Sequence, residues 1–289
     1  MRERHGLTQE NACALFGKTR QGYSKVSAIK RERASLEDAL RKAVCDIREQ
    51  DPGIGGYKLW LMIKSAFGDR RIPGRDKFFA FLKRENMSLP RPKPRRTTNS
   101  NHRYRKYSNL IKDYVPMAAN RLWVSDITYI DMDRDCGYLH LVTDAYSHKI
   151  VGWCMADSLM AVHSIKALQM AIDQTHGQDL TGIIHHSDRG SQYCSYDYVA
   201  LLEEHNALIS MTEDYCPTDN AIAERTNGII KNELVYRVDR FSNLSDARKR
   251  IAEFIRFYND ERPHMSVGYK TPTVVHGEQG IQRKCWKNN

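Results

Sequence analysis

Three acidic residues have sequence surroundings that favour metal-dependent phosphoryl chemistry. Asp126 falls in a β-rich stretch, Asp188 directly follows a short apolar stretch, and Glu224 opens a helical pattern 36 positions after Asp188, with 35 residues between them. Carboxylates without thiols suit hard divalent cations, and two such ions about 3.5–4 Å apart support an in-line phosphoryl displacement. Each acid alone has an ordinary explanation as a turn former or a helix-end charge. Their joint placement is what predicts a metal site.

The second part of the chain predicts the elements that would bring these acids together. Three β-rich stretches with short connections predict an antiparallel meander at 121–130, 138–144 and 149–156. Alternating helices and strands, then two helices, are expected at 159–175, 181–186, 196–205, 207–211, 220–235 and 245–259. This order predicts an α/β ribonuclease-H-like catalytic domain, with a mixed five-stranded sheet flanked by helices. In that fold the first and fourth strands are neighbours, so Asp126 and Asp188 would converge.

Basic charge is concentrated in the first part of the chain. Residues 1–110 hold 26 Lys and Arg against 11 Asp and Glu, a net charge of +15, whereas residues 111–289 have a net charge of −5. Such asymmetry indicates that the first part binds a polyanion such as nucleic acid. A solvated basic surface is the alternative.

The basic N-terminal region is expected to be all-helical. A helix from Thr8, a break at Gly17 and a second helix from Thr19 predict a helix-turn-helix-like pattern within residues 1–50, although many αα-hairpins share it. A longer amphipathic helix is expected at 35–50. A small basic helical unit, the second candidate for DNA binding, is expected at 51–88, with helices at 57–67 and 75–85.

A basic Pro-rich linker is expected at 89–112, because alternating prolines remove backbone donors and disfavour helix. Its Arg95 and Arg96 are candidates for phosphate contact, and an inert hinge is the alternative. The catalytic core then spans 113–276 and a basic tail spans 277–289.

Composition excludes several protein classes. Of the 289 residues 41% are hydrophobic, enough for a buried core, and the apolar runs are far shorter than a membrane span. No signal peptide is visible after Met1. The seven cysteines form no C-x-x-C pair, so a disulfide framework and a structural zinc site are disfavoured. A reduced, cytoplasmic protein is expected.

Residues around the three acids are weighed for further roles. Lys231 is seven residues after Glu224, so on a continuous helix it would share that face about 10 Å along the axis, placed to meet DNA phosphate. Asn220 either orients the site or caps the helix. Arg262 either contacts DNA or ends the last helix. The pair 185–186 are either zinc ligands or, more commonly, one buried histidine and one lining the acidic site.

Four motifs closely resemble transposases of the insertion sequence 3 family, in particular the second-reading-frame product with its integrase-like core. They are W-V-S-D-I-T-Y-I at 123–130, H-H-S-D-R-G-S-Q-Y at 185–193, D-N-A-I-A-E-R at 219–225, and F-Y-N-D-E-R-P-H at 257–264 followed by G-Y-K-T-P. The resemblance implies that Asp126, Asp188 and Glu224 are the catalytic, metal-binding triad. It also implies two magnesium or manganese ions, strand cleavage by water at the ends of an insertion sequence, and strand transfer by the resulting 3′ hydroxyl.

The same resemblance implies partners and a location. These are double-stranded DNA at the element ends and the target, a homo-oligomer on that DNA, fusion or association with the upstream-frame product, no membrane, and a cytoplasmic place at the nucleoid. Many relatives carry S-F-F after the glutamate, whereas this chain has Arg225, Thr226 and Asn227. That departure bears on local packing or on DNA contact, and Arg225 is a candidate for the latter.

Two other functions are compatible with part of this pattern. A structure-selective nuclease would use the same fold and acids without strand transfer. A non-catalytic DNA-binding regulator would use only the basic region, and the intact acidic residues at all three positions argue against it.

Overall fold

The sheet of the second part forms because its strands are rich in apolar, β-branched and aromatic residues, and most of their side chains are buried. The computed structural model describes residues 8–68, 72–89, 104–133, 135–213 and 220–282. The strands are β1 (Leu122–Asp131), β2 (Cys136–Asp144), β3 (Ile150–Ala156), β4 (Ile184–Ser187) and β5 (Leu208–Met211). Their order is β3-β2-β1-β4-β5; β1, β2 and β3 pair antiparallel, and β1, β4 and β5 pair parallel. The predicted meander and the predicted neighbours, first and fourth strand, are confirmed.

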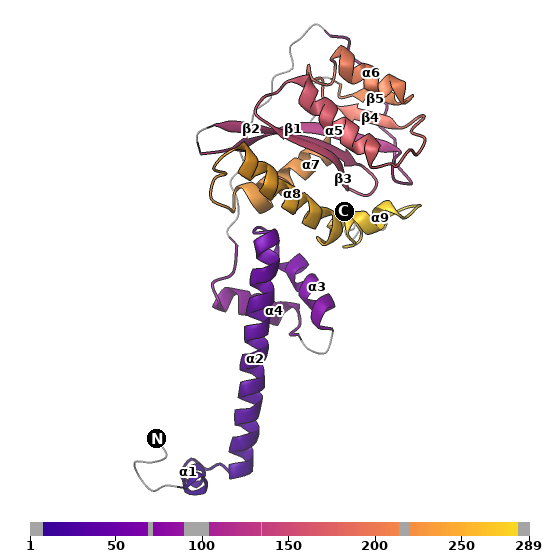
Figure 1. Cartoon of the computed structure of the whole chain (residues 1–289). Coiled ribbons are helices and arrows are strands. Elements are labelled where there is room, and N and C mark those ends of the chain that lie inside the picture. Colours follow the sequence, from indigo (N-terminus) through magenta and orange to yellow (C-terminus); the bar gives the residue numbers. More distant parts are fainter. Residues whose placement is uncertain (1–7, 69–71, 90–103, 134, 214–219, 283–289) are drawn as a thin grey trace.

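Helices cover both faces of this sheet (Figure 1). One face packs against α5 (Ala161–Asp173) and α6 (Tyr196–Glu204), and the other against α7 (Ala221–Ile230) and α8 (Leu244–Asp260). Successive residues of β1 divide between the faces, with Trp123 in the core beneath α5 and α6 and Val124 in the core with Ala223 of α7. The predicted ribonuclease-H-like architecture is confirmed.

The helix expected at 220–235 is not continuous. The α-helix ends at Ile230, and a π-helical turn, η1 (Lys231–Val235), follows it directly. Because the chain is α-helical from Glu224 to Lys231, the seven-residue spacing between them still applies, and the wider π turn changes the helical register only after Lys231. A short 3-10 turn, η2 (Met265–Val267), and α9 (Pro272–His276) complete this part of the fold.

The N-terminal region is helical, as expected, but its helices are divided differently. Helix α1 (Gln9–Leu15) starts at an N-cap, Thr8, and Gly17 with φ +63° follows it. A single helix, α2 (Arg20–Gln50), then replaces the two helices expected between 19 and 50. No proline or run of turn-forming residues interrupts this segment, and tertiary packing of its second half supports it.

The second half of α2 packs with α3 (Gly56–Phe67) and α4 (Arg75–Arg84) around one apolar core. Buried members of this core come from all three helices: Leu40, Val44, Leu59, Ile63 and Phe78. The boundary expected at residue 50 therefore does not separate two packing units. The three helices are called the helical unit below.

A buried ion cluster joins the helical unit to the catalytic part. Glu233 of η1 accepts two hydrogen bonds from Arg262, at 2.6 and 2.7 Å, and one from Lys58 of α3 at 3.2 Å. The Asp51 carboxylate, at the end of α2, lies 3.6 Å from the Arg262 guanidinium. Phe257 of α8 adds an apolar contact in the core of the helical unit. These four charged residues are called the junction cluster.

Among the described residues, no helix is both long enough and apolar enough to cross a membrane.

Candidate active site

Parallel pairing brings two of the three acids to the same level of neighbouring strands. The β1–β4 register runs to the pair Ser125 and Ser187, and the next residue on each chain is Asp126 and Asp188. Neighbouring strands are about 4.8 Å apart, so the two acids lie side by side at the point where β4 ends, in the interior of the sheet. Their mutual charge effect confirms the proximity, because Asp188 raises the pKa of Asp126.

The Asp126 carboxylate is held by one donor on each oxygen. Its Oδ1 accepts the backbone N–H of Ile127 at 2.8 Å, and its Oδ2 accepts the side-chain amide of Asn227 at 2.7 Å. Burial and the charge of Asp188 raise the pKa of Asp126 to about 7, while the two donors oppose that rise. On the neighbouring strand, Asp188 Oδ1 accepts the N–H of Gly190 at 2.9 Å.

Glu224 lies in the first turn of α7, which packs across β1. It is exposed, and desolvation raises its pKa. Its charge also raises the pKa of Asp126, but less than burial and Asp188 do. Within the described part of the chain, no three His, Cys, Asp or Glu side chains converge closely enough to hold a metal ion. The charge coupling of Asp126 is therefore stronger to Asp188 than to Glu224.

Buried polar atoms without a hydrogen-bond partner among the described residues surround the acid pair. Tyr193 is buried beside it, its pKa is raised by burial and by both aspartates, and its hydroxyl has no such partner. The Oδ1 atoms of Asn220 and Asn227 are also buried without a hydrogen-bond partner among the described residues. Satisfied buried polar groups are the rule, so such a group of exceptions indicates a binding site.

Asn220 occupies the N-cap position of α7 but makes no side-chain capping bond. Its amide instead donates to the backbone oxygen of Ser125 at 3.0 Å, which ties the start of α7 to β1. This contact supports an orienting role over capping, and the residue is 5% exposed.

Both histidines before Asp188 are buried, as was expected of one of them. His185 Nε2 lies 2.8 Å from Ser125 Oγ and 2.9 Å from the Tyr198 hydroxyl. His186 Nδ1 lies 2.8 Å from Ser210 Oγ. Burial lowers the pKa of His185 to about 3, which keeps the ring neutral. The pair stabilises the strands beneath the site.

Lys231 opens the π turn and is half-buried against β1. Burial lowers its pKa, and the carboxylates of Asp126 and Asp131 oppose that change. The lysine therefore lies near the acid pair. Arg225, next to Glu224, is exposed on α7.

The DNA contact expected at Arg262 is wrong. The side chain is 1% exposed and belongs to the junction cluster, because a buried guanidinium needs carboxylate partners and finds them in Glu233 and Asp51. It is a structural residue. The other two arginines expected to bind phosphate, Arg95 and Arg96, lie outside the described residues.

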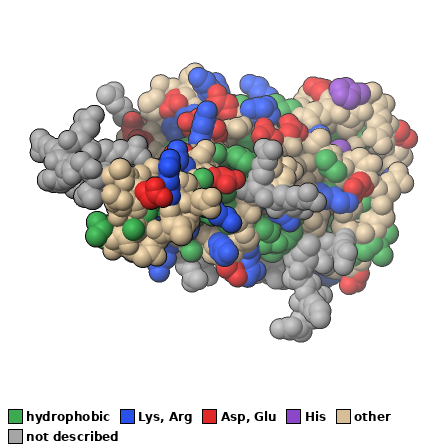
Figure 2. All heavy atoms as spheres, turned by 90° about the horizontal axis from the view of Figure 1, so that it is seen from below, with side chains coloured by type: hydrophobic (Ala, Val, Ile, Leu, Met, Phe, Trp, Pro, Cys, Tyr) green, Lys and Arg blue, Asp and Glu red, His purple; other side chains and the backbone are tan. Residues whose placement is uncertain are grey.

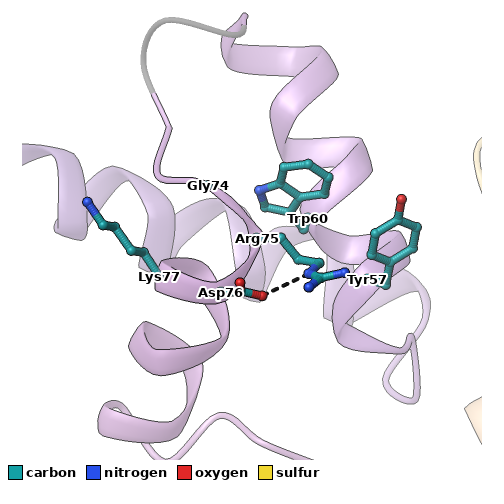
Figure 3. Close-up of a pocket in the computed structure, with 6 residues that line it drawn as sticks. All are labelled: Tyr57, Trp60, Gly74, Arg75, Asp76 and Lys77. Atoms are coloured by element: carbon teal, nitrogen blue, oxygen red, sulfur yellow. Dashed lines mark hydrogen bonds and ion pairs between the residues drawn. The ribbon is translucent and has the colours of Figure 1, made fainter.

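The helical unit has a shallow hollow that combines aromatic and basic side chains (Figure 3). Tyr57 and Trp60 of α3 have ring centroids 5.8 Å apart, and Lys64 lies 5.3 Å from the Trp60 centroid. Arg75, in the first turn of α4, is bonded to Asp76 at 2.9 Å. Rings and cations together are typical of nucleic-acid surfaces.

The view along α2 from its N-terminal end shows Lys and Arg interspersed with Asp and Glu (Figure 2). Within the helical unit several charges pair, such as Arg33 with Glu37 at 3.2 Å and Arg41 with Glu85 at 2.8 Å. The basic excess of the first part is thus not one uninterrupted patch on this face.

Comparison with known proteins identifies relatives over nearly the whole chain. Two segments, residues 116–217 and 205–272, match integrase core domain families. The chain is 31% identical to the 31 kDa protein of insertion element IS600 from Shigella sonnei, covering 91% of this chain and 96% of that protein. It is 32% identical to the transposase for insertion sequence element IS904 from Lactococcus lactis, covering 60% and 72%. It is 34% identical to transposase InsF for insertion sequence IS3A from Escherichia coli, covering 56% of each.

Among solved structures, the HTLV-2 integrase catalytic core domain in complex with magnesium is similar, with 20% identity and a TM-score of 0.43. That match covers 55% of this chain and 97% of that chain.

Proposed function

Because the chain belongs to the insertion sequence 3 family of transposases and carries an integrase core, it acts in DNA transposition, and we propose that Asp126, Asp188 and Glu224 form its catalytic metal site. The observation that supports this site best is the parallel register of β1 and β4, which aligns the two aspartates. The charge coupling of Glu224 to Asp126 adds the third acid.

The residues around Asp126 and Asp188 fit a hard divalent cation. Asp126 and Asp188 repel each other in a partly desolvated place, and a cation between them relieves that repulsion. The Tyr193 hydroxyl and Asn227 Oδ1, which have no hydrogen-bond partner in the described part of the chain, are suited to hydrogen bonds with water molecules of a hydrated ion. Oxygen donors without thiolate favour magnesium or manganese, two ions in each site.

Bound ions would activate the attacking oxygen and stabilise the leaving oxygen. Cleavage forms a bond between a water oxygen and phosphorus and breaks the bond from phosphorus to the 3′ oxygen. In strand transfer the freed 3′ hydroxyl oxygen would form a bond to a phosphorus of the target DNA, and the bond from that phosphorus to the target strand's 3′ oxygen would break. The chain's own part is to orient: backbone N–H groups hold Asp126 and Asp188, and Lys231 beside them offers a point charge to a phosphate.

Residues 1–110 bind double-stranded DNA in this proposal. The net charge of +15 supports it, as does the hollow lined by Tyr57, Trp60 and Arg75. The exposed Arg225 and the half-buried Lys231 would extend the contact to the catalytic core. Assembly of several copies on DNA, association with the upstream-frame product, and a cytoplasmic place at the nucleoid belong to the same proposal.

Isosteric substitution of the acids tests the catalytic site. Asp126→Asn, Asp188→Asn and Glu224→Gln should each abolish metal-dependent cleavage of element-end DNA, because each removes a ligand charge with little change of volume. Binding of the same DNA in a gel-shift assay should stay near the parental level. The control is Asp197→Asn, because Asp197 is an exposed acid in the first turn of α6. This variant should cleave DNA at the parental rate.

Near-parental cleavage by any one acid variant would remove that residue from the triad. A pre-cut DNA end supplied to the parental chain separates transposase from the nuclease alternative. Joining of that end to target DNA supports the transposase, whereas cleavage without joining supports the nuclease.

A further inference from the structure

The departure from S-F-F after the glutamate places an amide beside the acid pair. Asn227 is three residues after Glu224, so the two side chains lie on neighbouring positions of one face of α7. Its Nδ2 donates to Asp126 Oδ2 at 2.7 Å, across 101 residues of chain. A phenylalanine at this position has no donor for that carboxylate.

Asn227 is well suited to orient a charged ligand without neutralising it. The residue is 6% exposed, so its side chain is confined, and the opposite carboxylate oxygen is held by the Ile127 N–H at 2.8 Å. With one donor on each oxygen, the plane of the Asp126 carboxylate is fixed. The amide is neutral, so it leaves the full negative charge for a cation, whereas a lysine would compete with that cation.

The second amide atom of Asn227 adds an independent observation. Its Oδ1 is buried and has no hydrogen-bond partner among the described residues. It lies on the same amide group that holds Asp126, so it is near that carboxylate and can accept a hydrogen bond from a water molecule there. Partners of this kind behind metal-binding carboxylates typically change metal affinity by about 10- to 100-fold when removed.

We propose that Asn227 is a positioning residue that orients the Asp126 carboxylate for the divalent cation and ties it to the helix that carries Glu224. This inference rests on the proposed role of Asp126 as a metal ligand. Ala223, on the preceding turn, packs into the core with Val124 of β1, so α7 is held against the strand independently of the amide.

The test is a titration of the full chain with Mn²⁺, in which the electron paramagnetic resonance signal of the free ion measures binding. The free energy of unfolding is measured on the same samples. Asn227→Leu keeps the volume and removes the donor, and it should weaken Mn²⁺ binding by about 10- to 100-fold. Asn227→Gln, which keeps an amide, should recover part of that loss. Cleavage by Asn227→Leu should recover as Mn²⁺ is raised, while DNA affinity stays unchanged.

A matched control separates orientation from folding. Asn259 of α8 is a buried asparagine that bonds both backbone groups of Ile150, at 2.9 and 3.0 Å, in the core away from the acids. Asn259→Leu should lower stability and leave the Mn²⁺ dissociation constant unchanged. If Asn227→Leu behaves like Asn259→Leu, the residue is structural and the inference is overturned.

Asp126→Asn distinguishes failure of this inference from failure of the metal site. If Asp126→Asn weakens Mn²⁺ binding and Asn227→Leu does not, only the positioning role is wrong. If Asp126→Asn also leaves Mn²⁺ binding unchanged, the proposed metal site is wrong, and the inference falls with it.

Discussion

Replacing Arg262 by alanine should destabilise the chain by about 3–5 kcal/mol, because it removes both short hydrogen bonds to the buried Glu233 carboxylate and leaves Lys58 as its remaining cation. Arg262 is 1% exposed and donates to both oxygens of Glu233, at 2.6 and 2.7 Å, with Asp51 at 3.6 Å. Arg262 helps hold the pKa of Glu233 at about 2, whereas burial and Glu233 raise the pKa of Asp51 well above its ordinary value. The cluster is therefore stable with Glu233 ionised.

The sign of the pH dependence follows from Glu233. Its folded pKa is depressed, so its ionised form contributes stability above the ordinary carboxyl pKa, and that contribution is lost as the pH falls toward about 2. The difference in free energy of unfolding between the parent and Arg262→Ala should therefore be largest near neutral pH. It should shrink as the pH falls below about 4.5.

Denaturant unfolding of the parent and Arg262→Ala at pH 7 measures the effect, and a shift of the melting temperature of about 6–20 °C should accompany it. Arg256→Ala is the control, since that arginine lies on α8 six residues before Arg262, is 64% exposed and is 3.7 Å from Glu261. It should cost less than about 1 kcal/mol. Arg262→Met combined with Glu233→Met, which removes both charges, should be less damaging than Arg262→Ala alone. A loss at Arg262→Ala no larger than at Arg256→Ala would refute the reasoning.

Three further outcomes are expected. Because the pKa of Asp126 is raised to about 7, Mg²⁺ binding by calorimetry should strengthen about tenfold per pH unit up to pH 7 and then level off, and an affinity independent of pH below 7 would contradict this. Arg75 and Lys77 line the hollow between α3 and α4, and Lys64 lies over the Trp60 ring of the same hollow. Replacing these three residues together by alanine should reduce the slope of log K against log salt for DNA binding by about 0.9 per lost phosphate contact. An unchanged slope would exclude the hollow from the DNA interface. Lys231→Ala should slow strand transfer with little change in its dependence on metal concentration, and Lys231→Arg should restore part of the rate. Strand transfer at the parental rate by the alanine variant would show that Lys231 does not contact the DNA.

The strands, the fold class and the position of the acid pair were predictable because they depend on local patterns. The β-rich composition of residues 121–130 identifies β1 and places Asp126 on it, and a short apolar stretch before Asp188 identifies β4. Given the ribonuclease-H-like order of elements, adjacency of those two strands follows. The motif resemblance then selects these acids from the 35 acidic residues of the chain.

Tertiary structure alone decided which polar residues are buried. Arg262 lies in a stretch whose composition is that of an exposed helix end, and its carboxylate partners are 29 and 211 positions away in the sequence. Asn227 bonds an aspartate 101 positions earlier, and no local pattern distinguishes it from a solvent-facing asparagine. A periodic pattern reports the face on which a side chain lies, whereas a charged or amide group becomes buried only when distant segments supply its partners. That pairing is a property of the folded chain and is not encoded in any short window around either residue.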